Sequence, residues 1–244
     1  MSEPAVYQYP RRRVIRSILH TLSGLAFRTL ADTKVYGSEN LPRRGPLLVV
    51  ANHFSFLDPA LMVGIVPWPM EFLGGFRMPN APAWATIFPR LWGYFAVFRG
   101  GNSRTALQAA ESVLQHSGIV GIYPEAVASA AVLRTARPGA AYLASRTGTP
   151  ILPIGLDGLV DVFPKLRLRK RARVTVRIGK QIGPFSAADG KEHRRQLDSI
   201  SNDIMGSIAQ LLPEERRGRY SQDIKLRMQA EALDVYQFAQ EPEH

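Results

Sequence analysis

The sequence of 244 residues contains no cysteine. The absence of thiols excludes a disulfide framework, a thiolate metal site and a cysteine nucleophile. No apolar run reaches the length of about 18 residues that a membrane-spanning helix needs. The N-terminus also lacks the apolar core and the small-residue cleavage site of a secretory signal. We therefore expect neither a transmembrane segment nor a signal peptide.

Acidic residues are few relative to basic ones. Asp and Glu number 20 against 31 Lys and Arg, which gives a net charge of +11 and an isoelectric point near 10.3. Such a chain attracts polyanions, which include nucleic acid, an anionic membrane surface and phosphorylated substrates. A basic, solvated surface without a specific partner is the alternative.

Short β-rich runs alternate with helical stretches along most of the chain. We predict strands over residues 47–50, 71–73, 94–98, 119–123, 151–156 and 173–178. Helices are predicted over residues 59–65, 103–116, 138–146, 189–212 and 221–239. This alternation favours an α/β fold with a mostly parallel central sheet.

An N-terminal helix is predicted from apolar residues that recur three and four positions apart. They follow the basic triplet Arg11–Arg13 and comprise Val14, Ile15, Ile18, Leu19, Leu22, Leu25, Ala26 and Leu30. A basic amphipathic helix of this kind lies in a membrane interface or docks on the protein's own core, and the pattern leaves both open. We assign residues 1–34 to this N-terminal helical segment and residues 35–244 to a domain with a helical C-terminus.

A candidate catalytic pair lies between Val49 and Pro59. There a hydrophobic strand runs into a polar turn that carries His53 and Asp58, and sites in parallel α/β sheets form at the carboxyl ends of strands. If the turn brings the two side chains together, Asp58 accepts a hydrogen bond from one ring nitrogen of His53 and fixes its tautomer, which leaves the other ring nitrogen as a general base. Alternatively, Asp58 is only the N-cap of a helix that Pro59 opens.

Four blocks of the sequence resemble the glycerophospholipid acyltransferases, the family that includes 1-acyl-glycerol-3-phosphate acyltransferase. The first block is Asn52-His53-x-Ser55-x-x-Asp58. Three further blocks follow in the family's order. They are Gly-Tyr-Phe-Ala-Val-Phe-Arg at residues 93–99, Ile-Tyr-Pro-Glu at residues 122–125 and Thr-Pro-Ile-Leu-Pro-Ile at residues 149–154. The resemblance covers residues from roughly 35 to 185.

The resemblance implies a fold, a reaction and a set of site residues. The implied fold is a mostly parallel sheet of about seven strands with flanking helices, preceded by a membrane-associating helical segment. In the implied reaction His53 takes the proton of a glycerol hydroxyl of lysophosphatidic acid, Asp58 orients the ring, and the hydroxyl attacks an acyl thioester of coenzyme A or acyl carrier protein. The product is phosphatidic acid, and neither a metal nor a resident cofactor is implied. The substrate-binding residues implied are Asn52, Ser55, Arg99, Glu125 and Pro153.

The third block departs from the family pattern after Glu125. Ala126 and Ala128 stand where the family has Gly and an Arg, and the resemblance implies that this Arg grips the acceptor's phosphate. Arg134 and Arg137 lie a short way downstream and are candidates to reach the same phosphate. Alternatively, the acceptor is a different lysophospholipid or a glycolipid.

A basic run of Lys165, Arg167, Arg169, Lys170, Arg171 and Arg173 precedes the last predicted strand. It could dock on anionic lipid headgroups, bind the phosphates of coenzyme A, or simply be solvated. We expect a peripheral or monotopic protein at the cytoplasmic side of a membrane, and we expect no nucleic-acid partner. The rival interpretation is a non-catalytic relative that binds lipid or nucleic acid through its basic surface.

Overall fold

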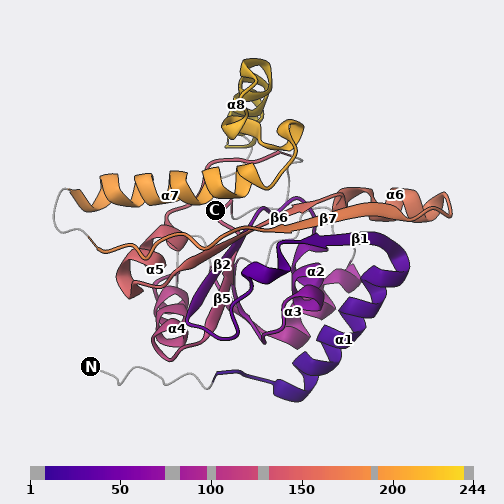
Figure 1. Ribbon diagram of the computed structural model, residues 1–244, viewed down its shortest axis with the longest axis horizontal. Coiled ribbons are helices and arrows are strands. Elements are labelled where there is room, and N and C mark those ends of the chain that lie inside the picture. Colours follow the sequence, from indigo (N-terminus) through magenta and orange to yellow (C-terminus); the bar gives the residue numbers. More distant parts are fainter. Residues whose placement is uncertain (1–8, 75–82, 98–102, 126–131, 188–191, 239–244) are drawn as a thin grey trace.

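A central sheet of seven strands, flanked by helices on both faces, organises the computed structural model (Figure 1). The structure describes residues 9–74, 83–97, 103–125, 132–187 and 192–238. Within these residues the strand order is β1-β7-β6-β2-β5-β3-β4. The predicted α/β class with about seven strands is confirmed.

The strands are short, and the central ones are wholly buried. They are β1 (Ala31–Tyr36), β2 (Leu47–Ala51), β3 (Glu71–Gly74), β4 (Tyr94–Ala96), β5 (Ile119–Ile122), β6 (Ile151–Asp157) and β7 (Ala172–Ile178). Six of them match predicted strands with small shifts at their ends. The sequence did not predict β1, because Ala31 is the only fully buried residue of this edge strand and no apolar run marks it.

The sheet is mixed rather than uniformly parallel. All neighbouring strands pair in parallel except β6 and β7, which are antiparallel. Strands β1 and β7 therefore run opposite to the other five. Because β2, β5, β3 and β6 share one direction, their carboxyl ends lie at the same edge of the sheet, where sites form in α/β folds.

The helices bury an apolar layer on each face of the sheet. Residues of α4 (Ser103–Gln115), α5 (Gly139–Thr147) and α7 (Glu192–Gln210) pack on one face. Residues of α1 (Arg13–Leu30), α2 (Asp58–Ile65), α3 (Ile87–Trp92) and α6 (Val162–Arg167) pack on the other. The last helix, α8 (Ile224–Phe238), stands away from the sheet (Figure 1). Short 3₁₀ helices cover Ser38–Asn40, Ala83–Thr86, Leu159–Asp161, Glu214–Arg216 and Gly218–Tyr220.

Helix α1 turns its apolar stripe outward. Val14 is 74% exposed and Leu25 is 59% exposed, and Ile15, Ile18, Leu22 and Leu30 are exposed as well. The residues that face the protein are instead Arg16, Ser23 and Phe27. The helix thus docks on the domain, as one of the two interpretations expected, but it does so through Arg16, Ser23 and Phe27 rather than through most of its apolar stripe. No helix in the described part of the chain is long and apolar enough to span a bilayer.

A buried ion pair and a close helix contact fix α1 in this orientation. The guanidinium of Arg16, only 1% exposed, donates to both carboxylate oxygens of Glu71 at 2.7 Å, and its Nε donates to the carbonyl of Trp92 at 3.0 Å. Burial alone would raise the pKa of Glu71, but hydrogen bonds from Arg16 and Arg11 outweigh it and lower that pKa. Gly64 of α2 lies directly against the backbone of α1 at Gly24, where even a Cβ would be 2.8 Å from the Gly24 nitrogen.

Candidate active site

The candidate site is built on the turn that joins β2 to α2. Asn52 is the first residue after β2, and its side chain is fully buried. Its Nδ2 donates to the carbonyl of Leu156 at 2.8 Å, and its Oδ1 accepts the Leu156 N–H at 2.7 Å. The amide therefore continues the ladder between β2 and β6 and holds the turn in place, and both of its polar ends are used within the protein.

His53 and Asp58 form the pair that the sequence suggested. The Nδ1 of His53 lies 2.8 Å from Oδ2 of Asp58, which also accepts the Ser55 N–H at 2.8 Å. Because a carboxylate accepts hydrogen bonds, Nδ1 carries the proton and Nε2 is left as an acceptor. Asp58 is the first residue of α2, and Leu57 is the N-cap, so the expectation that Asp58 caps a helix opened by Pro59 is wrong by one position. Ser55 closes the turn, since its Oγ accepts the Leu57 N–H at 3.2 Å.

The two members of the pair differ in exposure. The side chain of His53 is 18% exposed, whereas that of Asp58 is 1% exposed. Burial raises the pKa of Asp58, although the hydrogen bonds from His53 and Ser55 act in the opposite direction. The imidazole thus keeps part of its surface accessible, while the carboxylate that orients it is shut off from water. This is the arrangement of a general base with a buried orienting group.

Residues that follow β5 complete the surroundings of His53. The ring of Tyr123 stacks on the imidazole, with ring centroids 4.3 Å apart and planes 21° apart. Glu125, two residues further on, accepts the backbone N–H of His53 on Oε1 at 2.9 Å and that of Arg134 on Oε2 at 3.1 Å. Burial, opposed by these two hydrogen bonds, raises the pKa of Glu125 to about 8. Near neutral pH this carboxyl is therefore mostly protonated.

The structure brings some of the predicted residues together and leaves others apart. Arg134 lies beside Glu125 through its backbone, whereas Arg137 is exposed, with its N–H bound to the carbonyl of Pro124 at 2.8 Å. Pro153 is buried inside β6, where its carbonyl accepts a hydrogen bond from Gly179.

Some predicted positions lie outside the described residues. They are Arg99 and the departure from the third block at Ala126 and Ala128. Tyr123 was quoted in the third block but was not predicted as a site residue. Its place at the carboxyl end of a predicted strand was the signal that pointed to it.

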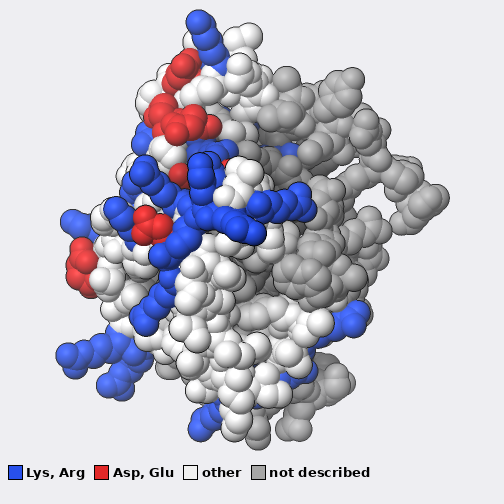
Figure 2. Space-filling view, turned by 90° about the vertical axis from the view of Figure 1, so that its right-hand side faces the viewer, with Lys and Arg blue, Asp and Glu red and all other residues white. Residues whose placement is uncertain are grey.

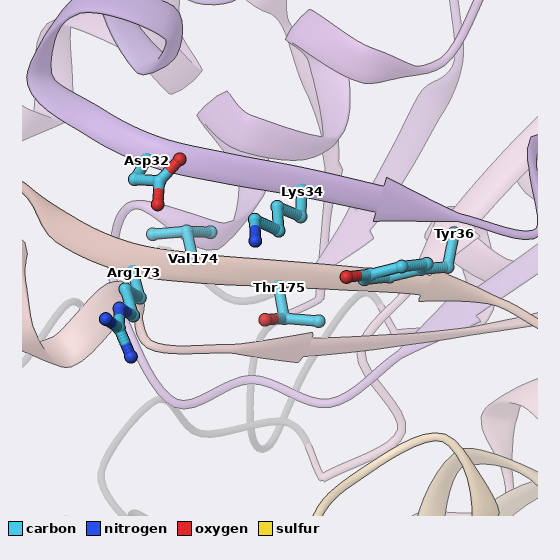
Figure 3. A pocket seen from close by; sticks show the side chains of 6 residues that line it. All are labelled: Asp32, Lys34, Tyr36, Arg173, Val174 and Thr175. Atoms are coloured by element: carbon cyan, nitrogen blue, oxygen red, sulfur yellow. The ribbon is translucent and has the colours of Figure 1, made fainter.

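Hollows also open on the surface that the described residues form. One of about 130 Å³ begins at the His53 turn and is lined by apolar residues: Phe56, Leu57, Pro59, Ala60, Ala85, Phe88 and Pro89. The other, of about 360 Å³, lies over β1 and β7, where Lys34, Arg173 and Asp32 line it together with Tyr36, Val174 and Thr175 (Figure 3). None of the predicted site residues lines this second hollow. In the described part of the chain, no group of three or more acidic, His or Cys side chains gathers as a metal site would require.

The model of the family described as Acyltransferase matches residues 32–157, which is more than half of the chain. The chain belongs to the acyltransferase family. The match includes β2, the His53–Asp58 turn and β5, and it ends at the last residue of β6. The residues that lie around His53, up to Glu125, are therefore inside the part of the chain that matches the family model.

Curated relatives and a solved structure point the same way. A 1-acyl-sn-glycerol-3-phosphate acyltransferase of Borreliella burgdorferi is 26% identical over 133 residues, which cover 54% of this chain and 53% of that protein. One of Chlamydomonas reinhardtii is 26% identical over 194 residues, or 75% of this chain and 57% of that protein. The chain thus spans little more than half the length of these relatives.

The crystal structure of the 1-acyl-sn-glycerophosphate (LPA) acyltransferase PlsC of Thermotoga maritima has the same fold. Its TM-score is 0.56 at 24% identity, over 79% of this acyltransferase and 78% of that chain.

Proposed function

We propose that this acyltransferase moves a fatty acyl group from an acyl thioester to a hydroxyl of lysophosphatidic acid and so produces phosphatidic acid. The observation that carries the proposal is the His53–Asp58 pair, with Nδ1 held by a buried carboxylate and Nε2 free to accept a proton. The curated relatives are named as 1-acyl-sn-glycerol-3-phosphate acyltransferases, which agrees with an acceptor that carries a phosphate.

The steps follow from this geometry. The acceptor hydroxyl gives its proton to Nε2 of His53 while its oxygen bonds to the thioester carbon, and the buried charge of Asp58 stabilises the imidazolium that forms. The tetrahedral intermediate then collapses, the carbon–sulfur bond breaks, and the thiolate of coenzyme A or of acyl carrier protein takes the proton from the imidazolium. The apolar hollow beside the His53 turn is where the acyl chain of the donor would lie.

The acceptor's phosphate needs a cation, and Arg134 is the candidate nearest to the pair. The N–H that Arg134 donates to Glu125 places this residue next to the backbone of His53. An Arg on this segment would supply the fork of donors that the third block lacks. Arg137, on the same segment, is the second candidate, and Arg99 belongs to the same predicted phosphate site. If neither Arg134 nor Arg137 serves, a different lysophospholipid or a glycolipid is the acceptor.

Thiol release from a long-chain acyl-coenzyme A in the presence of lysophosphatidic acid tests this proposal. We expect wild-type transfer to fall by about 10²–10⁴-fold in His53→Ala, because a general base contributes that much. His116→Ala is the matched control, since His116 is an exposed histidine just after α4 whose ring bonds to the carbonyl of Ser112 in that helix. Transfer that is unchanged in His53→Ala would refute the mechanism. Transfer to another lysolipid alone would move the assignment to that acceptor.

A membrane surface is the partner that the outer face of the domain supports. The exposed stripe of α1 is a continuous apolar surface, which is unusual on a soluble protein and typical of interfacial helices. The basic run adjoins its C-terminal end, because Arg171 donates to the carbonyls of Arg28 and Ala31. Figure 2, which views this end of the molecule, shows Lys and Arg gathered above a surface with few charges. Attraction to anionic lipid favours the cytoplasmic leaflet.

Co-sedimentation with phospholipid vesicles tests this surface. We expect the double variant Leu22→Ser, Leu25→Ser to bind on the order of 100-fold more weakly, since each buried leucine contributes about 1.5 kcal/mol or more. The double variant Ile224→Ser, Met228→Ser is the control, because these residues are equally exposed on α8. Equal losses in both variants would refute a specific role for α1. Vesicle binding that does not change with the fraction of anionic lipid or with salt concentration would refute the role of the basic run.

A further inference from the structure

Two buried polar atoms beside His53 lack hydrogen-bond partners. They are the hydroxyl oxygen of Tyr123 and Oδ1 of Asp58, neither of which has a partner among the described residues. Native proteins rarely leave such groups unpaired, because each costs folding free energy. The two are complementary, since a phenol donates a hydrogen bond and a carboxylate accepts one.

Both groups are held against the same imidazole. The Tyr123 ring stacks on one face of His53, and Phe72 stacks behind Tyr123 with centroids 6.1 Å apart and planes 5° apart. The Asp58 carboxylate bonds to the edge of the imidazole through Oδ2. Burial and, secondly, the charge of Asp58 raise the pKa of Tyr123 well above its ordinary value, so the phenol keeps its proton and remains a donor.

The Tyr123 hydroxyl is directed into the protein rather than toward a substrate. Its oxygen is shut off from solvent, whereas the His53 side chain keeps 18% of its surface exposed. Among the neighbouring acceptors, both carboxyl oxygens of Glu125 already take backbone N–H groups from His53 and Arg134. Oδ1 of Asp58 is the acceptor at this site with no donor assigned to it.

We infer that Tyr123 is a positioning residue for the His53–Asp58 pair. Its ring holds the imidazole, and its hydroxyl donates to Oδ1 of Asp58 through one bridging water molecule. The inference rests on the proposed function for its catalytic meaning. Asp58 then receives hydrogen bonds from His53 and Ser55 and, through the water molecule, from Tyr123, which fixes the direction of its carboxylate. The stacked ring restricts rotation of the imidazole, so Nε2 stays aimed at the open site.

Replacement of Tyr123 by Phe isolates the hydroxyl, because the stacked ring is kept. Loss of the donor concentrates negative charge on the Asp58 carboxylate, which then stabilises the imidazolium more strongly. We expect the pKa of His53, followed by NMR of its ring signals, to rise by about half a unit in Tyr123→Phe. The acid limb of the pH–rate profile should move upward by the same amount, and kcat/KM should fall by roughly threefold to tenfold with little change in KM.

Thermal unfolding gives a second readout that does not depend on activity. If the hydroxyl bonds to Asp58, Tyr123→Phe leaves Oδ1 unpaired and lowers Tm by roughly 2–4 °C. If the hydroxyl is unpaired in solution, the same substitution raises Tm and leaves the His53 pKa unchanged, which would overturn the inference. Tyr142→Phe is the control, because Tyr142 packs against the layer on the other face of the sheet. In the Tyr142→Phe variant, the pKa of His53 should equal that of the wild type.

The outcome also separates this inference from the proposed function. A shifted His53 pKa and a lowered Tm in a wild type that transfers no acyl group would uphold the role of Tyr123 and refute the reaction. If the wild type transfers the acyl group but the His53 pKa is the same in Tyr123→Phe as in the wild type, the reaction is upheld and the role of Tyr123 is refuted.

Discussion

The buried carboxyl of Glu125 gives this protein a pH-dependent stability that can be measured directly. Burial raises the pKa of Glu125 from 4.5 to about 8. Between these two values the folded chain binds more protons at this position than the unfolded chain does. The contribution of Glu125 to stability is therefore fully present below pH 4.5, declines as the pH rises, and is lost once the pH passes about 8.

The size of the effect follows from the interval between the two pKa values. At about 1.4 kcal/mol per pH unit, it amounts to about 5 kcal/mol of unfolding free energy. The substitution Glu125→Gln removes the titration and keeps the shape of the side chain. Its amide nitrogen cannot accept the Arg134 N–H, so we expect a constant loss of about 1 kcal/mol in addition.

Urea unfolding of the wild type and of Glu125→Gln, measured from about pH 5 to about pH 9, isolates this group. We expect the wild type to be more stable than the variant by about 1 kcal/mol near pH 5 and less stable by about 3 kcal/mol near pH 9, because the buried carboxyl then ionises. Glu39→Gln, an exposed carboxyl replaced in the same way, should follow the wild-type curve. Parallel curves for the wild type and Glu125→Gln would show that Glu125 is ionised in the folded state, and the reasoning from burial would fail.

Two further predictions concern the contacts that hold the site and α1. Asn52→Ala removes both hydrogen bonds to the backbone of β6, so we expect a loss of about 2–4 kcal/mol in urea unfolding and reduced transfer; a stable, fully active variant would contradict this role. Gly64→Ala forces α1 away from α2, and we expect a loss of about 1–3 kcal/mol. Gly206→Ala, where nothing lies within 4 Å of the added carbon, should instead stabilise α7 by about 0.5–1 kcal/mol. Equal effects of the two glycine substitutions would refute the close helix contact.

Much of the sheet is predictable from the sequence because buried strands carry continuous apolar runs. Leu47–Ala51 is buried at every position, and its composition alone indicates a central strand. Strand β1 lacks this signal, since it lies at the edge of the sheet and exposes Lys34, Val35 and Tyr36. Its pairing with β7 depends on residues more than a hundred positions away, which no local pattern reports.

The candidate site shows the same division. The spacing of His53 and Asp58 after a strand predicts their pairing, because the turn is local. The stacking of Tyr123 on His53 joins the ends of two different strands and could not be read from spacing. Which face of α1 packs on the domain could not be predicted from the sequence either. An apolar stripe ordinarily turns inward, and what reverses it here is the contact of Arg16 with Glu71, 55 residues along the chain.

For the membrane surface proposed above, that buried contact has a mechanical consequence. A helix attached through a flexible linker would leave the domain free to tilt and to change its height above the lipid. Here α1 is clamped to β3 through Arg16 and Glu71 and packed tightly on α2. Once the outward stripe meets a bilayer, the imidazole of His53 is held at one depth and one angle. The enzyme would then select its substrates partly by where in the lipid layer their reacting atoms lie.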